Sequence, residues 1–138
     1  MRSTAMEHAI TVTTDLSFDA ALQATRERLA DEGFGILSEI DLAATLKAKI
    51  GADMPPQVIL GACRPPLAYA AVLAEPSIGV FLPCNVVVRV DDAGRTVVEA
   101  MNPDFMTQIA SGETLAEVAK DAKERITRAL DAIAAASV

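Results

Sequence analysis

The chain has 138 residues and a formal net charge of −7, and 51% of its residues are hydrophobic although only 4% are aromatic. This length favours one domain with an aliphatic core. An acidic surface repels phosphate backbones and anionic lipids, so nucleic acid and membranes are disfavoured as partners. Residues 1–18 lack the apolar stretch of a signal peptide, and no run approaches the roughly 18 apolar residues of a membrane span. A cytoplasmic protein with reduced thiols is therefore expected.

Apolar periodicity predicts alternating strands and helices in the first half of the chain. Ser17 is typical of a helix N-cap, and Gly33 is typical of the residue that follows a helix end. Asp41 is a second N-cap candidate. The predicted order is a strand over residues 8–13, a helix from 18 up to 33, a strand over 34–41, a helix over 42–50 and a buried strand over 58–63.

The second half begins with a proline pair that suits the first turn of a helix. The helix that follows, over residues 67–74, is apolar nearly all round, so we expect it to be largely enclosed. The last helix has a clear apolar stripe with charges on its other side, which predicts an amphipathic helix. The predicted order is a helix over 67–74, a strand over 79–90, a hairpin loop over 91–94, a strand over 95–101, a short helix over 103–109 and a long helix over 114–134.

Together these elements predict an α/β (α+β) fold. We expect a single two-layer domain over residues 1–138, with a mixed sheet of about five strands, helices packed on it and a long C-terminal amphipathic helix.

Two cysteines beside prolines are the main candidates for chemistry. Cys63 ends a predicted strand just before Arg64 and a helix start, an environment that can lower a thiol pKa. Cys84 falls inside the predicted strand over 79–90, where a core role is favoured. They are not spaced as a Cys-x-x-Cys redox pair. If the two cysteine-bearing strands are antiparallel neighbours, the thiols approach each other.

Other polar residues are weaker candidates. Glu39 and Asp41 share one side of a predicted strand and could exchange protons, although a solvated edge residue and a helix cap are the favoured interpretations. Asn102 is a candidate ligand-binding residue as well as a helix cap. His8 is the single histidine of the chain, so the sequence predicts no metal site and no cofactor. Glycine-rich phosphate loops and a Gly-x-Ser-x-Gly elbow are absent from the sequence, which disfavours nucleotide and hydrolase chemistry.

Three motifs resemble the domain-of-unknown-function 302 family over about residues 13–133. They are Gly33-Phe34-Gly35 with Glu39-Ile40-Asp41, Gly61-Ala62-Cys63-Arg64-Pro65 with Ala68-Tyr69-Ala70, and Ile78-Gly79 with Leu82-Pro83-Cys84-Asn85-Val86-Val87-Val88. The resemblance implies a small α/β protein that forms dimers, has no established activity and is associated by context with sulfur or redox metabolism. The family motif has Asn where this chain has Arg64, so no role that needs an amide there carries over. The matched positions of interest are Glu39, Asp41, Cys63, Pro65, Tyr69, Pro83 and Cys84.

Three functions remain open from the sequence. The favoured one is a homodimeric module that binds a small ligand or a thiol-reactive species near Cys63, with Arg64, Cys84 and Asn102 as further contacts. The second is a thiol-dependent redox or sulfur-transfer enzyme, in which Cys63 is the nucleophile and Glu39 or Asp41 carries protons. The third is a structural or interaction protein in which both cysteines only fill the core.

Overall fold

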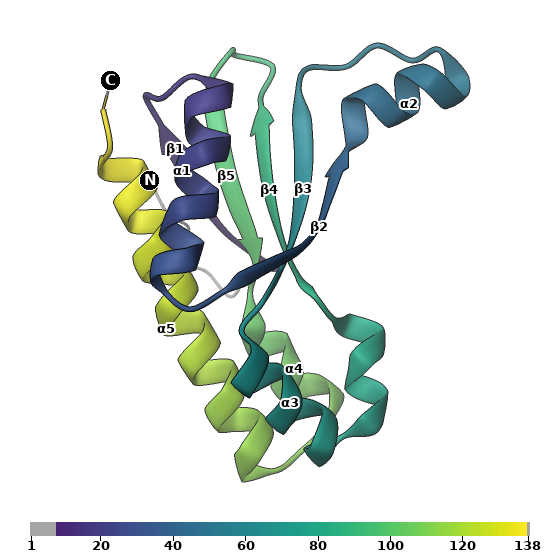
Figure 1. The fold of residues 1–138 in the computed structure, drawn as a ribbon, viewed down its shortest axis with the longest axis vertical. Coiled ribbons are helices and arrows are strands. Elements are labelled where there is room, and N and C mark those ends of the chain that lie inside the picture. Colours follow the sequence, from purple (N-terminus) through teal and green to yellow (C-terminus); the bar gives the residue numbers. More distant parts are fainter. Residues whose placement is uncertain (1–7, 138) are drawn as a thin grey trace.

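Five strands form one antiparallel sheet, in the order β1-β5-β4-β3-β2, in the computed structural model, which describes residues 8–137 (Figure 1). The five-stranded α/β fold and the long C-terminal helix predicted from the sequence are confirmed. The strands are β1 (Ala9–Thr14), β2 (Gly35–Asp41), β3 (Gln57–Cys63), β4 (Cys84–Val90) and β5 (Thr96–Met101). The helices are α1 (Phe18–Asp31), α2 (Leu42–Ile50), α3 (Pro65–Ala74), η1 (Pro76–Phe81), η2 (Pro103–Phe105), α4 (Met106–Ile109) and α5 (Glu113–Ala135).

Helices α1 and α5 lie side by side on one face of the sheet and close the main core (Figure 1). The apolar stripe of α5 is buried along its whole length, as the sequence predicts. The predicted ends of α1 are also confirmed, because Ser17 Oγ accepts a hydrogen bond from Ala20 N and Gly33 follows the helix with a φ of 86°. The ends of α1 and the buried face of α5 can therefore be predicted from local sequence signals.

The expectation of a mixed sheet is wrong, because all four strand pairings are antiparallel. Neighbouring parallel strands need a crossover connection that passes over a face of the sheet. Helices α2 and α3, which connect β2 to β3 and β3 to β4, instead lie at opposite ends of the sheet (Figure 1). Each of these chain segments therefore turns back beside the strand it has just left.

The predicted strand over residues 79–90 is wrong in its first part. Residues Pro76–Phe81 form the 3-10 helix η1, and β4 begins only at Cys84. Pro83 has no N–H to donate to a neighbouring strand, which accounts for the late start. Cys84 is therefore the first residue of a strand and not an interior one.

The prediction that the helix over residues 67–74 is enclosed is also wrong. Ala71 is the buried residue of α3, whereas Tyr69 and Leu73 are 67% and 65% exposed. Helix α3 lies beyond the end of the sheet with η1 and α4, so only one side of it meets the rest of the chain (Figure 1). An evenly apolar sequence does not show that every side of a helix is covered.

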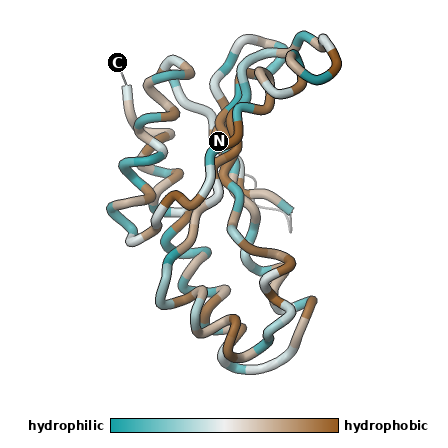
Figure 2. Tube along the Cα trace, turned by 45° about the vertical axis from the view of Figure 1, so that its right-hand side comes forward, coloured by the Kyte–Doolittle hydropathy of each residue, from teal (hydrophilic) through white to brown (hydrophobic). Residues whose placement is uncertain are grey.

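Helix α2 projects from the other end of the sheet (Figure 1). Asp41 caps it as predicted, since Asp41 Oδ1 accepts a hydrogen bond from Ala44 N at 2.9 Å. None of its residues is buried, and Ile50 is 73% exposed. Figure 2 shows hydrophobic segments both in this projecting part and in the lobe around α3. No helix within residues 8–137 is long and apolar enough to cross a membrane.

Candidate functional site

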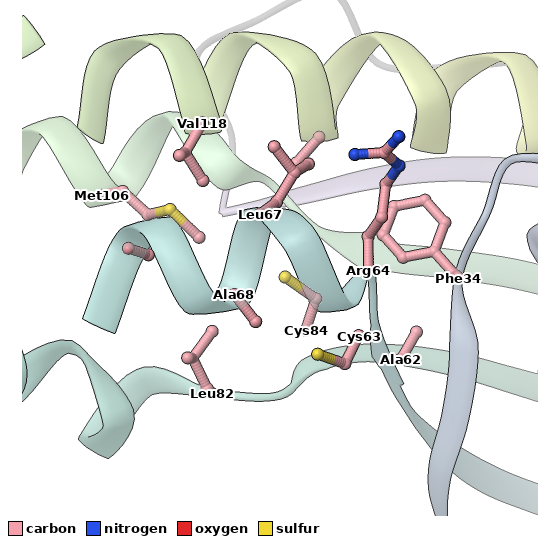
Figure 3. Close-up of a pocket in the computed structure, with 12 residues that line it drawn as sticks. Phe34, Ala62, Cys63, Arg64, Leu67, Ala68, Leu82, Cys84, Met106 and Val118 are labelled. Carbon is pink, nitrogen blue, oxygen red and sulfur yellow. The ribbon is translucent and has the colours of Figure 1, made fainter. Parts of the chain in front are cut away.

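The two cysteines meet at the end of the sheet beneath α3. Strands β3 and β4 are paired so that Ala62 lies opposite Cys84, which makes Cys63 the diagonal neighbour of Cys84. The antiparallel pairing of these strands, which the sequence left as a condition, is present in the structure. Successive residues of a regular strand face opposite sides. Cys84 therefore faces the same side as Ala62, whereas Cys63 is the last residue of β3, and both residues contribute to the wall of one cavity at the first turns of α3 (Figure 3).

Prolines set both ends of this arrangement. Pro65 is the first residue of α3, where its fixed φ and missing N–H suit a helix start, so the chain leaves β3 directly after Cys63. Pro83 precedes Cys84 and follows Leu82 through a cis peptide bond. Both cysteines are free thiols.

The cavity is small and apolar. Its volume is about 30 Å³, and β3, β4, α3, α4 and α5 all contribute to its wall. The residues that line it are Phe34, Ala62, Cys63, Arg64, Leu67, Ala68, Ala71, Leu82, Cys84, Met106, Val118 and Ala122. Sequence reasoning missed the wall apart from the cysteines and Arg64, because the sequence contains no signal that α4 and α5 close over the end of β3.

Both thiols are held in their protonated form at neutral pH. Burial raises the pKa of Cys84 to about 11, with a smaller contribution from neighbouring Cys63, and Cys84 is 6% exposed. Burial also raises the pKa of Cys63, which is only half-buried. The suggestion that the surroundings of Cys63 lower its pKa is therefore wrong. Desolvation outweighs any help from Arg64 and from the start of α3.

Arg64 lies on the α5 side of the cavity. Its Nη1 is 4.0 Å from Asp121 Oδ2, and Asp121 Oδ2 also accepts a hydrogen bond from Arg125 Nε at 2.9 Å. Arg64 Nε is buried without a hydrogen-bond partner among the described residues. A Cβ atom on Gly33 would lie 3.1 Å from this nitrogen, so the glycine leaves room for the arginine. Arg64 therefore lies in the cavity wall, and its guanidinium is only partly paired.

The remaining candidate residues lie outside the cavity. Glu39 Oε1 accepts hydrogen bonds from Arg26 Nε at 3.1 Å and Nη2 at 2.7 Å on the exposed edge strand β2. Asp41 is the cap of α2 described above. Asn102 Oδ1 accepts from Asp104 N at 3.0 Å and caps η2. These three side chains therefore have structural partners, and the thiols have no carboxylate beside them in the described wall.

His8 is also separate from the cysteines, since it lines a depression on another part of the sheet together with Glu99 and Met101. Within residues 8–137 no group of three or more His, Cys, Asp or Glu side chains is placed to hold a metal ion.

Comparison with known proteins agrees with the motifs. The profile of the domain of unknown function DUF302 matches residues 10–133. A crystal structure of an uncharacterised conserved DUF302 protein from Bacillus stearothermophilus is similar, with a TM-score of 0.84 and 30% identity over 94% of this chain and 99% of that chain. No match was found among curated proteins. On its matched residues and its fold, this chain belongs to the DUF302 family.

Proposed function

We propose that the protein is a homodimeric binding module that holds a small thiol-reactive species at Cys63, in the cavity beneath α3. One observation carries this proposal: two residues with free thiols, Cys63 and Cys84, line one apolar cavity, and of the two Cys63 is the one partly open to solvent. Because Cys63 is accessible and Cys84 is buried, a thiol-reactive species from solvent would reach Cys63 first. Arg64 supplies a positive charge at the wall, and Cys84 supplies a second sulfur.

The enzyme alternative is less well supported. A nucleophilic cysteine needs a depressed pKa or an adjacent base. Both thiol pKa values are raised, and Glu39 and Asp41, the expected proton carriers, lie outside the cavity wall. These features favour binding over turnover.

Alkylation of the folded protein tests the binding proposal. We expect a maleimide to label Cys63 in the native state and Cys84 only after unfolding, with peptide mapping as the readout. Cys63→Ser provides the control, since it should remove native labelling completely. Equal labelling of both cysteines that begins only in denaturant would contradict the proposal, because Cys63 would then be core packing.

The dimer part of the proposal rests on an arm, which we define as edge strand β2 and helix α2. Leu37 of the arm is 66% exposed, Ile40 and Ile50 are exposed too, and α2 buries no residue of its own. An exposed edge strand with apolar side chains favours pairing with another chain. A second copy is the occupant implied by the resemblance to dimeric proteins.

Analytical ultracentrifugation tests the dimer. We expect the native protein to sediment as a dimer and Ile50→Glu to sediment as a monomer. Val80→Glu is the matched control, because Val80 is an exposed apolar residue of η1, which lies in the lobe with α3 and away from the arm. A native protein that is monomeric at high concentration, or a control that dissociates as completely as Ile50→Glu, would argue against this interface.

A further inference from the structure

The sheet has a covered face and an open face. Helices α1 and α5 both pack on one face, whereas α2 and α3 lie at the two ends of the sheet (Figure 1). Successive side chains of a strand point to opposite faces. Because Val12, Leu60 and Val88 are buried in the core under α1 and α5, the side chains between such positions belong to the open face.

Strand register aligns the residues of the open face in rows. The middle row crosses all five strands and consists of Thr11, Glu99, Val87, Ile59 and Ile40. Its last three members are apolar, and Ile40 is 46% exposed while Ile59 and Val87 are half-buried. A solvated face of an antiparallel sheet normally carries polar residues. This apolar run therefore indicates that another molecule covers the face.

The open face carries almost no charge. The rows on either side of the middle row are Thr13, Val97, Arg89 and Gln57, and Ala9, Met101, Asn85, Gly61 and Ser38. Arg89 and Glu99 are the charged residues of the three rows, and Arg89 Nε lies 2.5 Å from Glu99 Oε1. Thr11 Oγ1 also donates a hydrogen bond to Glu99 Oε2 at 3.1 Å. The face is therefore electrically balanced, although the chain has a net charge of −7.

This balance of charge indicates which partner fits the face. Two copies of a chain with a net charge of −7 repel each other wherever acidic surfaces meet, so a face without net charge is the one on which they can approach. A basic partner would instead be drawn to the acidic parts of the surface. The buried centres of protein interfaces are likewise depleted in charged residues. A second copy of this chain is therefore the favoured occupant.

The open face is continuous with the arm. Ile40 belongs to β2 of the arm and pairs in register with Ile59 of β3, so its side chain extends the apolar row of the face. The apolar surfaces of the arm and of the sheet thus meet at Ile40. One partner can cover both.

The face is large enough to contribute most of a stable contact. Its five strands of six or seven residues, spaced about 4.8 Å apart with about 3.3 Å per residue, cover roughly 480 Å². A standard interface buries about 800 Å² per partner. The face supplies more than half of this area, and the arm extends it.

We propose that the open faces of two copies pack against each other in the dimer, with Ile40, Ile59 and Val87 in the contact. This inference rests on the proposed dimer and names the surface that the second copy covers. The dimer then has four layers, with the two sheets inside and the α1–α5 layer of each copy outside. Sheets packed in this way lie about 10 Å apart and bury the side chains between them.

Analytical ultracentrifugation of the full chain over a series of concentrations tests the proposal. Ile59→Glu and Val87→Glu should each raise the dissociation constant of the dimer about 100-fold or more, because an unpaired carboxylate would be buried in the contact. Ala30→Glu is the matched control, since it adds the same charge at an exposed position of α1 and should leave the dissociation constant unchanged.

Far-UV circular dichroism establishes that each variant is folded. Both substituted side chains point away from the core, so the fold should tolerate them. Val87→Thr is a milder variant for the case in which the glutamate variants unfold, because it keeps the shape of the side chain and its preference for strands. It should weaken the dimer about 10-fold, since a hydroxyl would be buried without a partner.

The outcomes separate this inference from the proposed function. A dimer that dissociates in Ile50→Glu but persists in the variants of Ile59 and Val87 would overturn the packing of the open faces and leave the arm interface in place. Equal dissociation of Ala30→Glu would also overturn it, because added charge at any position would then be sufficient. A native protein that is monomeric at high concentration would overturn both the open-face contact and the dimer.

Discussion

Gly61 and Pro83 lie so close across the β3–β4 pair that a Cβ atom on Gly61 would come within 2.7 Å of Pro83 Cγ. The same atom would also collide with the hydroxyl of Ser38 on β2. Side chains of β2 and of the residue just before β4 therefore meet over Gly61, where only a hydrogen atom fits. Pro83 directly precedes Cys84, so this close packing also holds one side of the cysteine site.

Gly61→Ala is expected to lower the free energy of unfolding by about 1–3 kcal/mol, the usual cost of overpacking. Urea denaturation measures the change. Gly79→Ala is the matched control, since nothing lies within 4 Å of its Cβ position and its stability should hardly change. Equal stability of Gly61→Ala and the native protein would show that Pro83 and Ser38 move away without strain.

The buried thiol of Cys84 predicts a loss of stability in alkaline solution. Burial, with a contribution from Cys63, raises its pKa from 9.0 to about 11, so the unfolded chain loses this proton first. The stabilisation is fully present below about pH 9 and is lost as pH rises through about 11. Relative to Cys84→Ala, the native protein should lose about 2–3 kcal/mol across this range.

Urea unfolding of both proteins at a series of pH values checks this prediction. The comparison with Cys84→Ala removes the contributions of other groups that titrate in alkaline solution. Parallel curves for the two proteins would mean that the thiol ionises in the folded state as readily as in the unfolded chain.

Two leucines on different helices should differ strongly in their contribution to stability. Leu130 of α5 is fully buried, so Leu130→Ala should cost about 2–5 kcal/mol. Leu73 of α3 is mostly exposed, and Leu73→Ala should stay within about 0.5 kcal/mol of the native protein. Thermal or urea unfolding gives both values. A large loss in Leu73→Ala would indicate that α3 is covered in solution, for example by another chain.

Asn102 is expected to act as a helix cap and not as a ligand contact. Its Oδ1 accepts from Asp104 N, and its own N–H donates to His8 O at 2.9 Å. Asn102→Ala should lower the free energy of unfolding by about 1 kcal/mol, as loss of an N-cap usually does. The rate at which maleimide labels Cys63 should not change. Unchanged stability together with altered labelling would assign Asn102 to the binding site.

Much of the fold could be predicted because its signals are local. Ser17 and Asp41 begin helices, Gly33 and Gly51 follow helix ends with positive φ, and a periodic stripe defines α5. Each of these signals works through contacts within a few residues of the chain. The strand pairing of Cys63 and Cys84 could be stated only as a condition, since strand order depends on distant segments.

The predictions that failed concern long-range packing. An apolar sequence suggested that α3 is enclosed, but burial depends on which elements stand opposite each side of a helix. The environment of Cys63 is a second example. Sequence adjacency to Arg64 suggested a lowered pKa, whereas the apolar wall supplied by α3, α4 and α5 raises it.

By itself the sequence determined the helix ends, the number of strands, the family motifs and the importance of the two proline-flanked cysteines. These follow from local backbone preferences and from residue order. Only the tertiary structure decided that both cysteines contribute to the wall of one small cavity, that Glu39, Asp41 and Asn102 lie outside it, and that α2 projects unburied. The reason is physical: a thiol pKa and a cavity volume depend on side chains that meet only when five distant elements pack together.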